Sequence, residues 1–187
     1  MRPAFLATAS CALAFASCAG PQSWPDVDQS FTLAGGAVEP ADGLDGRGAG
    51  SVAWSWRGKQ WPCAVEFGIQ YAGIEIEGAP DSLDAGIFDM RIGAAQSWRP
   101  SKRYLLVVGA GPRLSFARTW RSGEYEDARD DSTSFGLYAH AGAFVRLGDM
   151  LSIGADAQAA TGSDYDLEGR ERDADSLGLM LALRWDF

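Results

Sequence analysis

Charged side chains recur in this sequence inside segments that otherwise consist of glycine, alanine and apolar residues. Acids and bases are similar in number among them, so a packed interior can pair them as ions. Two arginines, Arg146 and Arg184, are expected near one end of that interior. The other six residues are predicted to form a polar network. Five of them are expected near the middle, Glu66, Asp89, Arg91, His140 and Asp156, and Arg113 is expected somewhat closer to the opposite end.

His140 is the only histidine of the chain. A serine, a histidine and an acid within hydrogen-bond reach form the catalytic group of many acyl-transfer enzymes. His140 is expected to lie near Asp156 on the adjacent strand. With Ser115 on the other neighbouring strand, the three residues could form such a group only if their geometry allowed it. We expect His140 to fill the interior as a hydrogen-bonded side chain, and we predict no catalytic residue.

Two acidic clusters carry oxygen ligands of the kind that Ca²⁺ prefers. Neither has the twelve-residue loop pattern with its fixed glycine, so both are interpreted as solvated loops. The sequence also lacks a phosphate-binding loop and zinc-ligand spacing, so no metal site and no cofactor is predicted. The residues of the two clusters are Asp127, Asp130 and Asp131, and Asp164, Asp166 and Glu168.

Alternation of apolar and small or polar residues indicates the strands that must position these side chains. The last eleven residues, "LGLMLALRWDF", show it most clearly, with Leu177, Leu181 and Phe187 on one face and Met180 and Arg184 on the other. Eight such segments are predicted, near 29–38, 49–57, 61–72, 86–98, 103–120, 134–147, 150–160 and 176–187.

The connections between these segments alternate between short and long. The short ones, "GKQ", "RPSK" and "GD", lie beside basic residues, whereas the long ones are rich in Asp and Glu. Short turns on one rim and long loops on the other are typical of bacterial transmembrane barrels. The prediction is an all-β fold, an eight-stranded antiparallel up-and-down transmembrane β-barrel.

The apolar face of the strands is predicted to point outward, into lipid. The opposite face is mostly Gly, Ala and Ser with a few charges, which suits the crowded interior of a narrow barrel. Aromatic residues lie at both ends of the apolar face, as expected at two membrane interfaces. Those near the short turns are Trp56, Trp61, Trp98, Tyr104, Trp185 and Phe187, and those near the long loops are Tyr71, Phe88, Trp120 and Phe135.

On these features the chain resembles the small eight-stranded outer-membrane barrels of the OmpA and OmpX type, over residues 29–187. In that family the last strand ends in Phe with an aromatic or apolar residue two positions earlier, and the barrel assembly machinery reads this signal. Trp185 and Phe187 match it, while Ala182 stands where a Gly is common. The resemblance implies a location in the bacterial outer membrane, in contact with its lipid and lipopolysaccharide.

Lipid A deacylases of the outer membrane share the eight-stranded shape. They carry a nucleophilic serine two residues after a histidine, on the lipid-facing surface. Here Gly142 stands two residues after His140, and the strand parity turns His140 inward. A lipid-modifying enzyme is therefore the third of three functional hypotheses.

The N-terminus has the form of a secretory signal peptide, predicted over residues 1–18. Residues 15–18, "FASC", resemble a bacterial lipobox and predict lipidation of Cys18, and cleavage after "AFA" is the alternative. Residues 19–28 are expected to form a periplasmic lead-in. Cys11 should leave with the leader, so Cys63 remains alone or with Cys18, and no disulfide framework is implied.

The formal net charge of −9 argues against nucleic acid as a partner. The sequence thus predicts an outer-membrane barrel with a structural or surface-interaction role, long acidic extracellular loops and a lumen filled by polar side chains. A narrow channel or transporter for small solutes is the second hypothesis. The sequence names no extracellular ligand.

Overall fold

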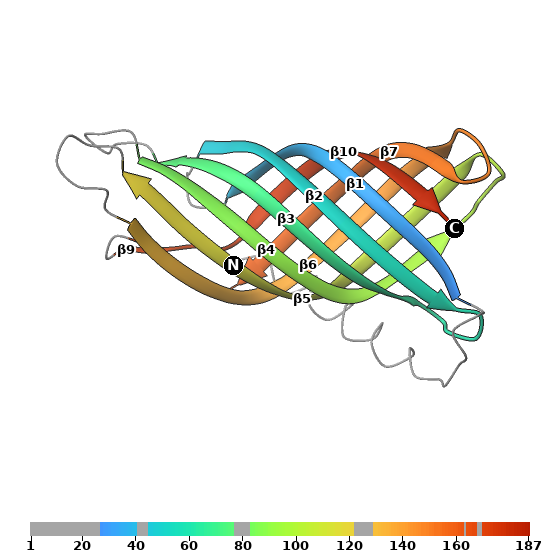
Figure 1. Ribbon diagram of the computed structural model, residues 1–187, viewed down its shortest axis with the longest axis horizontal. Coiled ribbons are helices and arrows are strands. Elements are labelled where there is room, and N and C mark those ends of the chain that lie inside the picture. Colours follow the sequence, from blue (N-terminus) through green and yellow to red (C-terminus); the bar gives the residue numbers. More distant parts are fainter. Residues whose placement is uncertain (1–26, 41–44, 77–82, 122–128, 163, 168–169) are drawn as a thin grey trace, which may run out of the picture.

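Eight long strands close into one antiparallel barrel, in which successive barrel strands pair and the last pairs with the first (Figure 1). The computed structural model describes residues 27–40, 45–76, 83–121, 129–162, 164–167 and 170–187. The barrel strands are β1 (Val27–Pro40), β2 (Asp45–Gly58), β3 (Ala64–Ile76), β4 (Leu83–Trp98), β5 (Tyr104–Arg121), β6 (Arg129–Arg146), β7 (Leu151–Gly162) and β10 (Ser176–Asp186). The predicted fold class is confirmed.

Several strands run farther toward the long loops than the apolar pattern predicts. β6 begins at Arg129, and its ladder with β5 includes the pair Trp120↔Arg129. Backbone pairing needs no apolar side chain, so a ladder can continue beyond the apolar segment. Inside the last long connection, β8 (Tyr165–Leu167) and β9 (Arg170–Arg172) form a small hairpin that the alternation did not predict.

The start of the third strand was predicted wrongly. The alternation suggested that Trp61 and Cys63 point outward in a strand, but β3 begins at Ala64 and Cys63 is buried. Pro62 has no N–H to give to a ladder, which explains the late start. Residues 59–63 form a turn instead, in which the Trp61 N–H donates to the Gly58 carbonyl at 2.9 Å.

The two faces of each strand follow the predicted parity. On β10, Leu181 is 74% exposed while its neighbours Met180 and Ala182 are 1% and 2% exposed. Apolar side chains cover the outer wall on the other strands as well, for example Ile92 on β4 and Phe135 on β6. Apolar surface of this extent is the surface of a barrel embedded in lipid.

Outward aromatic side chains lie near both rims. Trp98, Tyr104 and Phe187 are exposed beside the short turns, and Tyr71, Phe88 and Phe135 are exposed toward the long loops. Trp185 packs on Phe31 with ring centroids 5.7 Å apart. The side chain of Trp120 lies outside the described residues.

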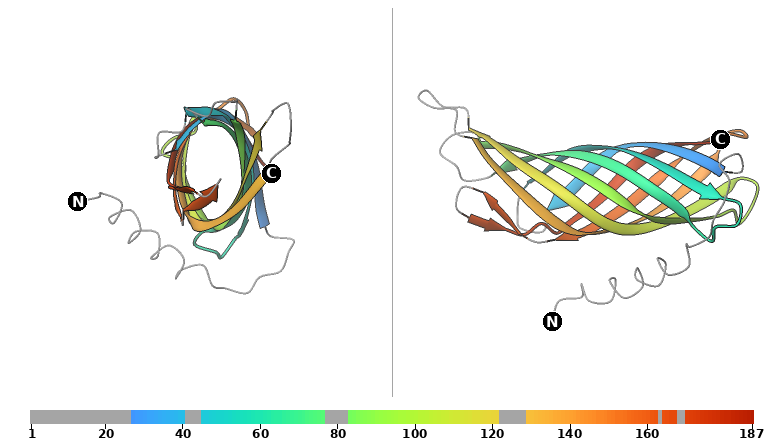
Figure 2. Two further views of the ribbon diagram at one scale, coloured as in Figure 1. Left: turned by 90° about the vertical axis from the view of Figure 1, so that its left-hand side faces the viewer. Right: turned by 60° about the horizontal axis from the view of Figure 1, so that its bottom comes forward.

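The barrel closes where its first and last strands meet. The Phe187 N–H donates to the Gln29 carbonyl at 2.8 Å, and the Gln29 N–H donates back at 3.3 Å. Both residues therefore lie at the short-turn rim, as an even number of strands requires (Figure 2). The barrel begins at Val27, two residues before the predicted boundary. Among the described residues, no helix is long and apolar enough to span a membrane.

Candidate functional site

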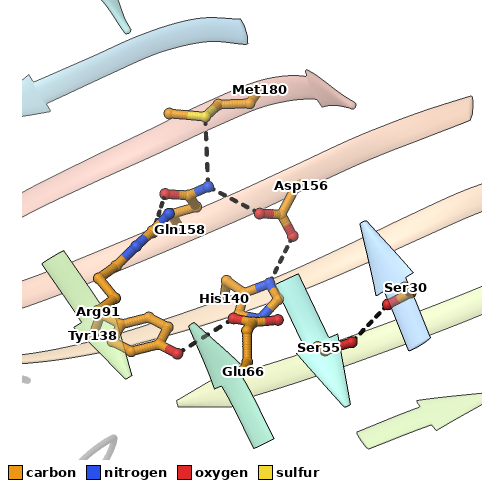
Figure 3. Close-up of polar contacts among 9 residues, drawn as sticks. All are labelled: Ser30, Ser55, Glu66, Arg91, Tyr138, His140, Asp156, Gln158 and Met180. Atoms are coloured by element: carbon orange, nitrogen blue, oxygen red, sulfur yellow. Dashed lines mark hydrogen bonds and ion pairs between the residues drawn. The ribbon is translucent and has the colours of Figure 1, made fainter. Parts of the chain in front are cut away.

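Polar side chains from several strands meet in the middle of the lumen (Figure 3). Arg91 on β4 donates from Nη1 to Gln158 Oε1 on β7 at 2.7 Å. Gln158 Nε2 donates in turn to Asp156 Oδ2 at 3.0 Å, and Asp156 Oδ1 lies 3.0 Å from His140 Nδ1 on β6. A chain of hydrogen bonds thus runs from Arg91 to His140 around one side of the barrel interior.

His140 lies between two carboxylates. Its Nε2 atom is 3.2 Å from Glu66 Oε1, close enough for an ion pair but poorly aligned for a hydrogen bond. Only the doubly protonated imidazole ring can donate toward Glu66 and Asp156 together. Tyr138 donates its hydroxyl to Glu66 Oε1 at 3.3 Å, and Arg91 lies over the Tyr138 ring at 5.2 Å. With His140 charged, the two acids are matched by two bases.

Asp89 and Arg113 form a second cluster, closer to the long loops. Their closest charged atoms are 3.8 Å apart, and both side chains are buried. Arg113 also donates to the Ala174 carbonyl at 2.7 Å and to Ser176 Oγ at 3.4 Å. The structure therefore places the six predicted residues in the lumen as two groups, with Arg113 attached to the chain segment that follows the β8–β9 hairpin.

Three further residues complete the central group. Gln158 and Tyr138 supply hydrogen bonds, and Met180 Sδ accepts from Gln158 Nε2 and from Ser51 Oγ, both at 3.4 Å. Strand parity could have identified them, because Tyr138 and Gln158 share the inward face with His140 and Asp156. They carry no formal charge at neutral pH and were passed over for that reason.

Glycines on β4 and β5 make room for the large inward side chains of β6. Gly109 lies opposite His140 in the ladder, and a Cβ atom there would collide with His140 Nε2. A Cβ on Gly93 would lie 2.6 Å from the Tyr138 hydroxyl. The small residues of the inward face are thus matched to particular large ones across the wall.

Apolar side chains fill the lumen on both sides of the polar groups. Toward the short turns, Leu105, Val107 and Phe144 form a buried layer. Toward the long loops, Tyr165 of β8 packs with Ala117 and Ala174. Three cavities of about 10, 20 and 20 Å³ lie among the inward side chains, each with room for roughly one water molecule.

The residues considered for catalysis do not come together. His140 and Asp156 are in contact, but Ser115 lies opposite Ser134, whereas His140 lies opposite Gly109. Ser115 lies six residue steps along β5 from Gly109, which is roughly 20 Å at the rise of an antiparallel strand.

No group of three or more His, Cys, Asp or Glu side chains suited to a metal ion occurs among the described residues. Of the two acidic clusters, Asp127 and Glu168 lie outside those residues, and the side chains of Asp130 and Asp166 are not described.

No model of a known protein family matches the chain, and no curated protein is similar to it. Solved structures do match. Neisserial surface protein A shares 16% sequence identity at a TM-score of 0.60, over 87% of this chain and 97% of its own. Ail, the attachment invasion locus protein of Yersinia pestis, was solved with the heparin analogue sucrose octasulfate. Ail shares 15% sequence identity with this chain at a TM-score of 0.56, and the match covers 86% of this chain and 97% of the Ail chain.

A third match is a major outer membrane protein from Thermus thermophilus, with 14% identity and a TM-score of 0.55. It covers 85% of this chain and 99% of its own. At such identities the likeness concerns the fold, and it agrees with the closed ring of eight strands and the apolar outer wall. The chain therefore has the fold of the small eight-stranded outer-membrane barrels.

Proposed function

We propose that this chain is an outer-membrane protein whose barrel is a filled anchor for surface loops with a structural or adhesive role. The observation that carries the proposal is the lumen, where the polar groups are enclosed between two apolar layers and the cavities admit about one water each. A barrel built in this way holds its loops at the membrane surface without needing an open pore.

The long connections are the proposed contact surface. They are acidic, and the strand ends that they join lie at the rim opposite Gln29 and Phe187. Because both chain ends of an exported barrel lie on the periplasmic side, the long loops would face the exterior. An acidic loop surface disfavours polyanionic ligands and favours cationic or neutral partners.

Membrane fractionation with conductance recording tests this proposal. We expect the protein in the outer-membrane fraction, with a gel mobility that changes on boiling, and without steady single-channel steps in planar bilayers. Steady steps would favour the channel hypothesis and contradict a filled anchor. Recovery in the soluble periplasm would contradict the membrane barrel itself.

Lipid, lipopolysaccharide and the barrel assembly machinery are the proposed partners of the barrel. The apolar wall would contact lipid, and Trp185 with Phe187 would be the assembly signal. Phe187→Asp is expected to lower outer-membrane levels sharply, while Trp98→Asp, at an exposed aromatic on the same rim, should lower them less. Equal losses for the two variants would mean that rim anchoring, and not a terminal signal, explains the effect.

We assign no catalytic residue. The Ser115 side chain lies far from His140 along the strands, and His140 faces the lumen between Glu66 and Asp156. Hydrolysis of lipopolysaccharide acyl chains by the purified barrel would contradict this assignment and favour the enzyme hypothesis.

A further inference from the structure

Cys63 is buried in the turn between β2 and β3 and is disulfide-bonded. It is the one cysteine within the described ranges. The sequence contains two others, Cys11 and Cys18, which both precede those ranges. The number and spacing of the cysteines imply no disulfide framework, so the bond at Cys63 is a finding that the sequence did not provide.

The chain enters the barrel beside this turn. Val27, the first residue of β1, pairs with Gly58, the last residue of β2. The Gly58 carbonyl accepts from the Trp61 N–H, and Arg57 Nε donates to the Trp61 carbonyl at 3.3 Å. These bonds hold the Cys63 turn at the point where the N-terminal segment meets the wall.

By their position in the sequence, both Cys11 and Cys18 are candidates for the partner of Cys63. Removal of the signal peptide distinguishes between them. Nine sequence steps lead from Cys18 to Val27, a reach of roughly 30 Å when extended. Cys11 lies in the apolar stretch of the predicted signal peptide and should be removed with it. Cys18 is retained if cleavage follows "AFA".

We propose that Cys18 and Cys63 form the disulfide of the exported chain, which fastens the N-terminal lead-in to the periplasmic rim. In this step each thiol loses a proton, and the two sulfurs form a bond as they give two electrons to the disulfide of a periplasmic oxidoreductase. The disulfide of the oxidoreductase takes up the two electrons and two protons and is reduced to a dithiol. The inference rests on the proposed export to the outer membrane.

This bond and lipidation of Cys18 exclude each other. A lipidated cysteine carries its lipid through a thioether on the same sulfur atom, so that sulfur cannot also bond to Cys63. The barrel already anchors the protein in the membrane, and an acyl chain would add little to that anchoring. In this proposal the sulfur of Cys18 is therefore bonded to Cys63 and is not lipidated.

Thiol trapping of the full chain tests the proposal. Cells expressing it with its own leader are quenched in acid, and outer membranes are dissolved in denaturant so that burial does not hide a thiol. A maleimide probe should label the wild-type protein only after reduction. Cys18→Ser and Cys63→Ser should each be labelled without reduction, whereas Cys11→Ser should behave as the wild type.

Mass spectrometry of the unreduced protein gives the second readout. We expect one cross-linked pair of peptides that contain Cys18 and Cys63. Lipid on Cys18, free thiols in the unreduced wild type, or a free Cys63 in Cys11→Ser would each overturn the proposal. Gel mobility with and without boiling shows first whether each variant is a folded membrane barrel, so a failure of the proposed function is seen separately.

Discussion

The lumen and the outer wall of this barrel are built by the same strands and follow opposite rules. On β10, Met180 is enclosed and accepts hydrogen bonds from Ser51 and Gln158, while Leu181, the next residue, is exposed. Outward side chains need only be apolar, because lipid adapts to their shape. Inward side chains must each fit a particular partner, because the lumen has almost no free volume.

This difference governs what a substitution costs. Inside, a change leaves a charge or a hydrogen-bonding group without its partner, and the small cavities beside Asp89 and Arg113 have room for only about one water each. Outside, a change matters mainly through polarity and depth in the bilayer. On β5, Arg113 faces inward and Arg118 faces outward, so the same substitution can be made in both environments on one strand.

The largest effect is expected for Arg113→Gln. The substitution removes the ion-pair partner of buried Asp89 and weakens the link to the Ala174 carbonyl. Breaking a buried ion pair costs about 3–5 kcal/mol of unfolding free energy. Urea unfolding from lipid vesicles, followed by tryptophan fluorescence, measures it. A loss below about 1 kcal/mol would show that the lumen is wetter than its cavities indicate.

The next effect tests the outer wall. Leu181 lies at the centre of β10 on the lipid face, so Leu181→Arg should cost about 2–4 kcal/mol near the bilayer midplane. Leu181→Phe should be close to neutral, because shape is unconstrained there. If arginine and phenylalanine were tolerated equally, water and not lipid would cover this face.

The apolar outer face of the barrel could be predicted from the sequence, whereas the contacts between inward side chains could be predicted only in part. Period-two alternation and the lengths of the connections were enough for eight strands, their parity and the contact between His140 and Asp156 on neighbouring strands. The contact between His140 and Glu66 crosses the lumen from β6 to β3. Which residues of opposite strands meet across the lumen depends on the tilt and stagger of the strands in the closed barrel. The pattern of a single strand does not encode that tilt or stagger.

Two local errors have physical causes of the same kind. Trp61 and Cys63 follow the alternation of the third strand, yet Pro62 between them ends the pairing that parity presupposes. The β8–β9 hairpin was interpreted as a loop because its strands are three residues each, too short for a periodic signal. Gln158 and Tyr138 were missed because only formal charges were followed through the inward face.

A smaller effect is expected where large and small residues are matched inside. Gly109→Ala would place a methyl group against the His140 ring, which Glu66 and Asp156 hold on both sides. Overpacking of this kind typically costs about 1–3 kcal/mol. Gly148→Ala is the control, because a Cβ atom there meets no atom within 4 Å. Similar losses for both variants would point to a general effect of replacing glycine in the backbone, and not to the fit with His140.

The smallest effect is expected for Arg118→Gln, five residues after Arg113 on the same strand. Arg118 Nε lies 2.6 Å from Asp131 Oδ1, a shorter contact than the 3.8 Å between Arg113 and Asp89. Both side chains of the outer pair are nevertheless about half exposed, so water and salt screen their attraction. Exposed pairs contribute about 0.2–1 kcal/mol, and the loss should fall further in high salt. Urea unfolding of Arg113→Gln and Arg118→Gln at low and high salt should therefore show the larger loss of unfolding free energy for Arg113→Gln, although its ion pair is the longer one. A larger loss for Arg118→Gln would mean that enclosure in the lumen does not decide the strength of an ion pair in this barrel.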